Sequence, residues 1–140
     1  MKTKVIDRKN YVLYIDKTKN RIYFELHNRR WELEDANLLL LDWKTAITQV
    51  QHNFTVLSDI RHLKIQSPKL DKLHEEAQKY VAENGLLKLA RVLSEDDVVN
   101  LQFSRIAERS SIPNDVFRTL EEAEEYLDNI TNEAKKISKP

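Results

Sequence analysis

The strongest constraint on the fold of this 140-residue chain is the alternation of two hydrophobic periods along it. Short, nearly continuous apolar runs occupy residues 54–60 and 86–93, and the segment 114–118, "NDVFR", is predicted to be a further short strand. The stretches between them carry apolar residues at helical spacing. An apolar run of this kind fits a short strand that is covered on both faces. Strands that alternate with helices are joined by crossovers and run parallel, so the chain is predicted to be an α/β protein.

The chain begins with two further strands. "NYVLYID" and "RIYFELH" are rich in β-branched and aromatic residues, and "KTKN" between them predicts an antiparallel hairpin. The predicted order is β-β-α-β-α-β-α-β-α, a five-stranded mixed sheet with four helices and with the first strand at an edge. We expect a single domain over residues 1–140, with a core of about 10–130 and with 131–140 extending the last helix or fraying. Leu57 lies in the middle of the most apolar strand and is predicted to be fully buried.

Composition excludes several classes of site. The chain has no cysteine, which excludes disulfides, thiol nucleophiles and thiolate metal sites. Its single glycine, Gly85, excludes the usual phosphate-cradling loops and the nucleophile elbow, which need two or more glycines at fixed spacing. The start of the chain lacks the apolar segment of a signal peptide, and the longest apolar run, "LLLL", is too short to span a bilayer. We expect a cytoplasmic protein without a cofactor and without a membrane span.

Charge is balanced over the whole chain but not along it. Lys plus Arg and Asp plus Glu number 23 each, whereas residues 1–30 hold nine basic and three acidic residues. This excess indicates solvated strand faces or, alternatively, a basic patch for an acidic partner. Because strand side chains alternate between two faces and the rest of the chain is acidic, we expect no nucleic-acid partner.

Three stretches resemble the STAS family, the SpoIIAA-like bacterial anti-sigma factor antagonists. They are "IYFELHNRRWELEDANLLLLDWKTAI", "FTVLSDIRHL" and "VFRTLEEAEEYL", and the last is similar to the ending of the STAS/SEC14-like branch. The resemblance implies the STAS fold and a non-enzymatic regulatory or protein-interaction module with a protein partner. The SEC14-like branch implies an alternative, a binder of a small apolar or lipid-like ligand. An enzyme is a third class, for which the sequence holds no nucleophile–base motif.

Ser67 matches the serine that a partner kinase phosphorylates in the phosphoregulated members of that family. The acid that precedes this serine in those members is Gln66 here, and the following glycine position is Lys69. These departures predict that the phosphoswitch is degenerate. A structural role has its own physical basis, because Ser is favoured as a helix N-cap and Pro68 as the first helical residue. Ser67 is therefore a candidate phospho-acceptor or helix cap, and we predict the cap.

A candidate ligand or partner loop follows the strand at 54–60. Ser58 and Asp59 lie where open sheets place ligands, outside the carboxyl ends of parallel strands, although Asp59 can equally order the loop. His62, Lys64, Ser67 and Lys69 come next and can hold an anion at a helix N-terminus. The four histidines show no metal-ligand spacing, so we expect no metal site and place them at or near the surface.

Leu38 and Leu41 are candidate interface residues. They lie off the inward stripe of the first predicted helix, where a surface helix carries polar residues. We expect them to belong to a homodimer or to a partner surface.

Overall fold

The computed structural model describes residues 1–27 and 30–138 of the chain. Its sheet has six strands in the order β1-β2-β3-β4-β5-β6. The hairpin β2–β3 is antiparallel, and β3, β4, β5 and β6 run parallel to one another. The predicted mixed α/β sheet is therefore confirmed. The strands are β1 (Thr3–Asp7), β2 (Tyr11–Asp16), β3 (Arg21–Leu26), β4 (Phe54–Asp59), β5 (Leu86–Val92) and β6 (Asn114–Phe117).

The predicted strand number was wrong. An additional strand, β1, pairs antiparallel with β2, so the edge strand is β1 and not "NYVLYID". β1 is five residues long, and its side chains are exposed or only partly buried. The pairing also shifts register between Lys4 and Ile6. Edge strands are commonly short, charged and irregular, which protects the sheet from pairing with other chains. Such a strand carries little hydrophobic pattern, so the sequence did not predict β1.

Four helical segments connect or follow the strands, and the first of them is interrupted. The expected single helix after β3 divides at Leu38, which ends α1 and precedes α2. The strand–helix order is otherwise as predicted, and the last helix continues to Ser138. No helix in the described part of the chain is long and apolar enough to cross a membrane. The helices are α1 (Leu33–Asn37), α2 (Leu39–Ile47), η1 (Pro68–Leu70, a 3₁₀ turn), α3 (Asp71–Glu83), α4 (Asp97–Ser110) and α5 (Leu120–Ser138).

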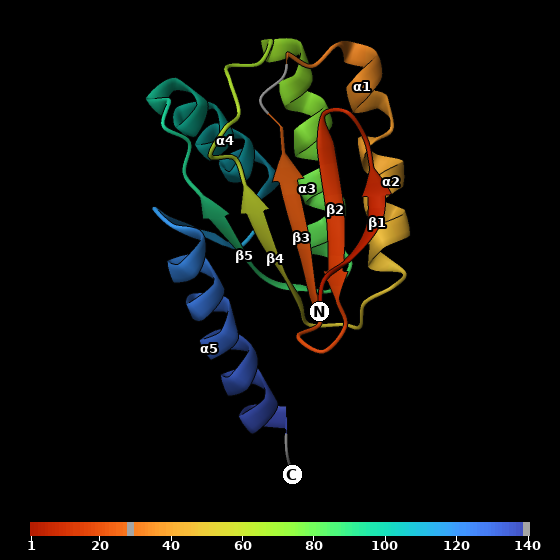
Figure 1. Ribbon diagram of the computed structural model, residues 1–140, viewed down its shortest axis with the longest axis vertical. Coiled ribbons are helices and arrows are strands. Elements are labelled where there is room, and N and C mark those ends of the chain that lie inside the picture. The colour runs from red at the N-terminus through yellow and green to blue at the C-terminus, as the bar shows by residue number, and fades with distance from the viewer. Residues whose placement is uncertain (28–29, 139–140) are drawn as a thin grey trace.

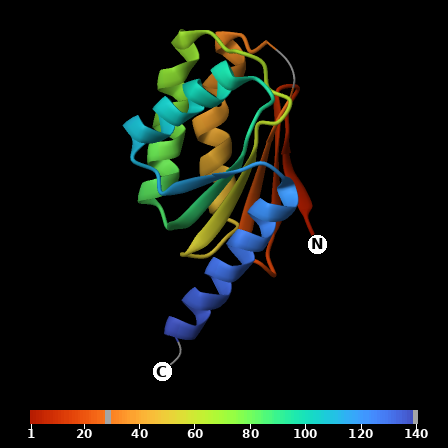
Figure 2. The same cartoon turned by 90° about the vertical axis from the view of Figure 1, so that its left-hand side faces the viewer.

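The two faces of the sheet are covered unequally. Helices α2, α3 and α4 lie on one face and α5 lies alone on the other (Figures 1 and 2). Helix α5 contacts β4, β5 and β6. The sheet face around β2 and the carboxyl end of β3 is thus left beside α5 rather than beneath it.

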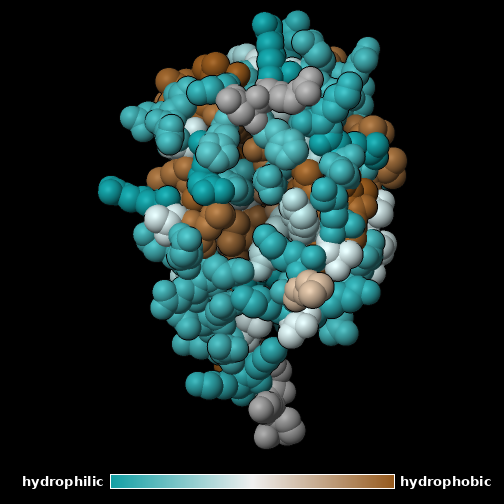
Figure 3. Space-filling model, viewed as in Figure 1, coloured by the Kyte–Doolittle hydropathy of each residue, from teal (hydrophilic) through white to brown (hydrophobic). Residues whose placement is uncertain are grey.

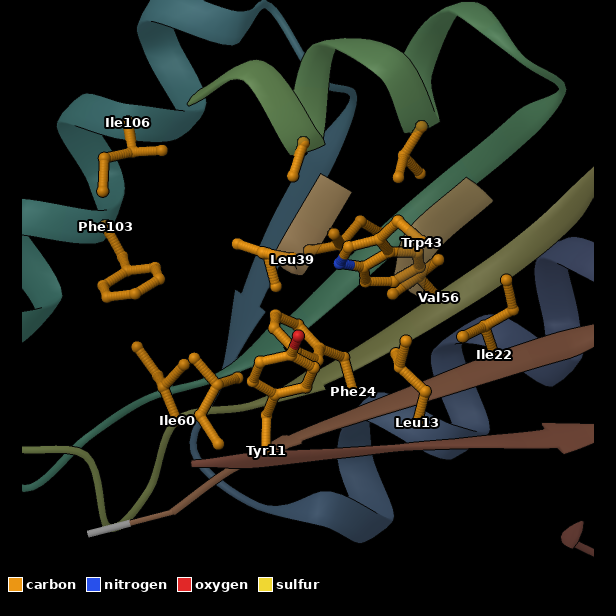
Figure 4. Close-up of a cluster of buried hydrophobic side chains, with 14 of the residues drawn as sticks. Tyr11, Leu13, Ile22, Phe24, Leu39, Trp43, Val56, Ile60, Phe103 and Ile106 are labelled. Carbon is orange, nitrogen blue, oxygen red and sulfur yellow. The ribbon is translucent and has the colours of Figure 1, made fainter. Parts of the chain in front are cut away.

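The main hydrophobic core lies between the sheet and helices α1 to α4 (Figure 4). Alternate residues of β3 and β4 point into it, as period-two strands require. Trp43 of α2 packs edge-on against Phe24 of β3, with ring centroids 5.1 Å apart. Other buried members that Figure 4 labels are Tyr11, Leu13, Ile22, Leu39, Val56, Ile60, Phe103 and Ile106.

A smaller core lies under α5. Ala123 and Leu127 of α5 pack on the opposite side chains of the same strands, including Tyr23 of β3 and Leu57 of β4. Because β4 has β3 on one side and β5 on the other, it is an interior strand of the sheet. The predicted burial of Leu57 is confirmed at 5 % exposure.

Replacing Leu57 with alanine is expected to lower the free energy of unfolding by about 2 kcal/mol in urea titrations. We expect the low end of the usual range because this side chain lines an open cleft, described below, so the variant leaves little enclosed void. Leu87→Ala is the matched control, since that residue of β5 is only partly buried. A loss below about 1 kcal/mol would contradict the role of Leu57 in the second core.

Part of the excess of basic residues at the start of the chain is paired within the protein. Arg8 forms two hydrogen bonds to the buried carboxylate of Asp42 on α2, at 3.0 and 2.9 Å. Arg21 and Lys19 pair with Glu124 and Asp128 on α5. Acidic residues of α2 and α5 thus neutralise three of these basic residues, which leaves less positive charge for an acidic partner than the sequence alone indicated.

Candidate functional site

The carboxyl end of β4 leads into a loop that carries most of the predicted site residues. Asp59 is buried at the strand end, and its carboxylate receives three hydrogen bonds from Arg61. These are the backbone N–H at 3.1 Å, Nε at 3.0 Å and Nη2 at 3.0 Å. The hydrogen bonds to Asp59 raise the pKa of Arg61. The pair orders the start of the loop. The sequence did not single out Arg61, because an aspartate and an arginine two residues apart match no known motif.

The other candidate loop residues do not gather around one point. Ser58 is buried and faces the main core, on the opposite side of β4 from Asp59. His62 and Lys64 are exposed and border a small hollow of about 210 Å³ beside Ser94. Ser67 and Lys69 are also exposed and lie further on, at the beginning of η1. The five side chains are therefore distributed over two faces of the sheet and along the loop.

Ser67 precedes the 3₁₀ turn that leads into α3. Its Oγ accepts a hydrogen bond from the backbone N–H of Lys69 at 3.3 Å, and Pro68 occupies the first position of the turn. This is the contact that a capping serine makes, although the helix it caps begins as a 3₁₀ turn. We propose that Ser67 is a structural cap.

Ser67→Ala is expected to lower the free energy of unfolding by about 0.5 kcal/mol, because the capping bond is long and exposed. Ser104→Ala on the exposed side of α4 is the matched control, since the same chemical change there removes no cap and favours helix slightly. Urea titrations of both variants measure the difference. Stoichiometric phosphate on Ser67 in protein purified from its native host would show a switch instead.

Gln66, at the position of the missing acid, anchors the loop. It is buried, and its side-chain oxygen accepts a hydrogen bond from the backbone N–H of Trp31 at 3.1 Å. Its Nε2 donates to the carbonyl of Lys64 at 2.8 Å, and its own carbonyl accepts from Gln102 of α4 at 3.2 Å. A buried amide with these neutral partners holds the loop against α1 and α4 without a charge. We infer that Gln66 has a structural role, which is to hold the loop in place through these hydrogen bonds.

His74 departs from the expected surface position of the histidines. It lies in α3 at 4 % exposure, between the rings of Trp31 and Phe103 at centroid distances of 5.0 and 5.2 Å. Burial lowers the pKa of His74 to about 4, so the imidazole is neutral in the folded protein at ordinary pH. Position 74 lies on the apolar helical stripe of Leu70 and Ala77, and this spacing is the sequence signal that could have predicted the burial of His74. Within the described residues no group of three His, Asp or Glu side chains is arranged to hold a metal ion.

The exposed leucines lie on the outer side of α1 and α2. Leu38 is 39 % exposed and Leu41 is 58 % exposed, and Leu33 of α1 is 54 % exposed. We call these three residues the α1–α2 apolar surface. In Figure 3 apolar side chains reach the surface on this side of the molecule.

A cleft of about 680 Å³ opens on the other face of the sheet, beside α5. Its apolar lining comes from β2, β3, β4 and the first turn of α5, and charged side chains surround it. Figure 3 views the molecule from this side and shows an apolar area framed by hydrophilic side chains. Asp59, Arg61 and His62 border the cleft at the carboxyl end of β4. Sequence reasoning did not find this cleft, because its walls come from elements far apart in the chain.

Comparison with known proteins places the fold. The chain is similar to the solved structure of SiaC of Pseudomonas aeruginosa, with a TM-score of 0.52 and 9 % sequence identity over 84 % of this chain and 99 % of SiaC. At this identity the similarity concerns the fold alone. No protein-family model matches the chain, and no curated protein sequence matches it either.

Proposed function

We propose that the protein is a non-enzymatic regulatory module that binds a protein partner through the α1–α2 apolar surface. The carrying observation is the exposure of three leucines on two consecutive short helices, where the inward stripe is already filled by Leu39 and Trp43. Exposed apolar patches of this kind are typical of interaction sites. A regulatory role is supported by the resemblance of three sequence stretches to the STAS family, whose members act by binding partner proteins, and the fold shared with SiaC agrees with it.

The phosphoswitch of that family is proposed to be degenerate here. Ser67 is engaged as a cap, and the neighbouring acid is replaced by the buried anchor Gln66. Binding would then be controlled by the concentration of the partner rather than by a phosphate on this loop. Self-association through the same leucines is the homodimer form of the proposal.

A lipid-like ligand is the weaker proposal on geometric grounds. The cavity enclosed between α3, α4 and the sheet amounts to about 20 Å³, which is room for one water molecule but not for an acyl chain. The large cleft beside α5 is open and bordered by charges, whereas a lipid chain requires an apolar enclosure.

Leu38→Glu and Leu41→Glu are expected to abolish partner capture without unfolding the protein, because both positions are exposed. The matched control is Leu101→Glu on α4, where the leucine is 51 % exposed on another helix. A pull-down from native lysate identifies the candidate partner by mass spectrometry, and calorimetry with that purified partner then compares the variants. Light scattering at high micromolar concentration tests the homodimer.

A protein captured equally well by wild type and by both leucine variants would contradict the proposed surface. A purified partner that binds Leu101→Glu as weakly as Leu38→Glu would also contradict it. A monomer mass that Leu38→Glu leaves unchanged would exclude self-association and leave the hetero-partner proposal in place.

A further inference from the structure

The cleft beside α5 has an aromatic and aliphatic floor. Tyr14 of β2 and Tyr23 of β3 lie next to each other in the antiparallel register, and Leu57 of β4 follows on the same face. Leu120, at the start of α5, closes one side. The volume of about 680 Å³ falls in the range of small-molecule sites. Tyr23 is held in place because its hydroxyl donates a hydrogen bond to Glu124 at 2.5 Å.

A cation of the chain itself already lies on this floor. The ammonium of Lys2 is 4.5 Å from the ring centroid of Tyr23 and 5.2 Å from that of Tyr14. Both distances are within the range of a cation–π interaction. Lys2 is exposed and precedes β1, and among the described residues it forms no ion pair with a carboxylate. The aromatic pair therefore already holds an ammonium, and no ion pair in the described part of the chain fixes that ammonium in place.

The charges around the floor also favour a cation. Four carboxylates line the cleft, and two of them are compensated: Asp59 by Arg61, and Glu124 by Arg21. The other two are Glu25 and Glu121. Glu25 lies 3.5 Å from the half-exposed His27, and Glu121 forms no ion pair within the described part of the chain. Arg61 attracts both of them electrostatically from its place beside Asp59. When Lys2 leaves, four carboxylates face the two arginines Arg21 and Arg61, so the cleft keeps a net negative charge next to two ring faces.

We propose that this cleft binds a small aliphatic organic cation, either a polyamine or a quaternary ammonium compound. The charged head takes the place of Lys2 over Tyr14 and Tyr23, and the aliphatic part lies along Leu57 and Leu120. Further ammonium groups of a polyamine meet Glu121 and Glu25 at the rim. Lys2 acts as an internal competitor that occupies the floor when no ligand is bound. The site is separate from the α1–α2 apolar surface and independent of partner binding.

The test is calorimetric titration of the full chain at about 0.15 M salt, which screens non-specific attraction of surface charges. The probes are spermidine, choline and, as an uncharged analogue of choline, 3,3-dimethyl-1-butanol. We expect saturable binding of at least one cation and no binding of the alcohol. Lys2→Ala is expected to tighten binding about two- to fivefold, the factor that corresponds to loss of an exposed cation–π competitor.

Two further variants locate the site. Tyr14→Leu removes one ring and is expected to weaken cation binding at least about fivefold. Glu121→Gln removes a charge at an exposed position, where the fold stays intact, and is expected to weaken cation binding about twofold or more. The matched control is Lys44→Ala on α2, where Lys44 Nζ lies 5.1 Å from the ring centroid of Tyr80. This variant removes a lysine–tyrosine contact away from the cleft and should leave cation binding unchanged. Absence of saturable cation binding to Lys2→Ala at 10 mM probe, or equal affinity of wild type, Tyr14→Leu and Glu121→Gln, would overturn the proposal.

Discussion

Replacing Arg21 with methionine is expected to lower the free energy of unfolding by about 3 kcal/mol. The Arg21 side chain is 0 % exposed and extends under α5. Its Nη1 lies 2.5 Å from Glu124 Oε2 and 2.9 Å from Asp128 Oδ1, and its Nε donates to Thr55 Oγ1 at 2.8 Å. Removal of one member of a buried pair leaves the other charge uncompensated. The effect lies at the low end of the usual range because Glu124 and Asp128 are 33 % and 40 % exposed.

The control for this prediction is Lys19→Met in the same network. Lys19 is 36 % exposed and approaches Asp128 at 3.2 Å, so its loss is expected to cost less than about 1 kcal/mol. Urea titration measures both variants, and amide hydrogen exchange shows where the loss occurs. We expect faster exchange along α5 in Arg21→Met, because the helix then loses its most buried polar contact with the sheet and keeps mainly the packing of Ala123 and Leu127. Equal stability of the two variants would exclude Arg21 as the anchor of α5.

Acidification is expected to remove about 3 kcal/mol of stability through His74. In the unfolded chain this imidazole has its ordinary pKa of about 6.5, whereas burial lowers the pKa in the folded protein to about 4. The unfolded state therefore binds the proton first. The contribution of neutral His74 to the free energy of unfolding is present above pH 6.5 and falls by about 2 kcal/mol by pH 5. This contribution stops falling once the pH is below about 4.

Urea titrations between pH 8 and pH 5 measure this loss, and His74→Phe is the matched variant. It keeps a ring between Trp31 and Phe103 but cannot be protonated, so its stability should be nearly constant over that range. The pKa values of Asp16, Asp115 and Asp128 are all lowered in the folded protein, so these carboxylates contribute only at still lower pH. An equal pH dependence of wild type and His74→Phe would exclude His74 as the cause.

Hydrophobic period predicted much of the fold. The parallel strands at 54–59, 86–92 and 114–117, the antiparallel hairpin before them and the burial of Leu57 all follow from local patterns. The pattern did not predict β1, because a charged edge strand buries few side chains. It also did not predict the interruption of the first helix at Leu38, where no glycine or proline marks the break.

The candidate sites were predicted less well, because they depend on contacts between distant segments. The candidate residues from Ser58 to Lys69 do lie at and after the carboxyl end of β4, but the structure distributes their side chains over both faces of the sheet and pairs Asp59 with Arg61. The cleft beside α5 combines residue 2 with residues 14, 23, 57 and 120. A periodic pattern reports which side of an element is apolar but not which other element covers that side.

The sequence by itself determined the class of this protein: strands and helices alternate, so the sheet is mostly parallel and the chain is an α/β domain. The absence of cysteine and the single glycine excluded whole classes of site. Only the tertiary structure decided which charges meet. Arg21 bonds to Glu124, 103 residues later, because α5 packs alone on its face of the sheet and brings acidic side chains onto a basic strand. The same packing leaves β2 and β3 open beside α5, so the cleft arises from the placement of one helix rather than from any local motif.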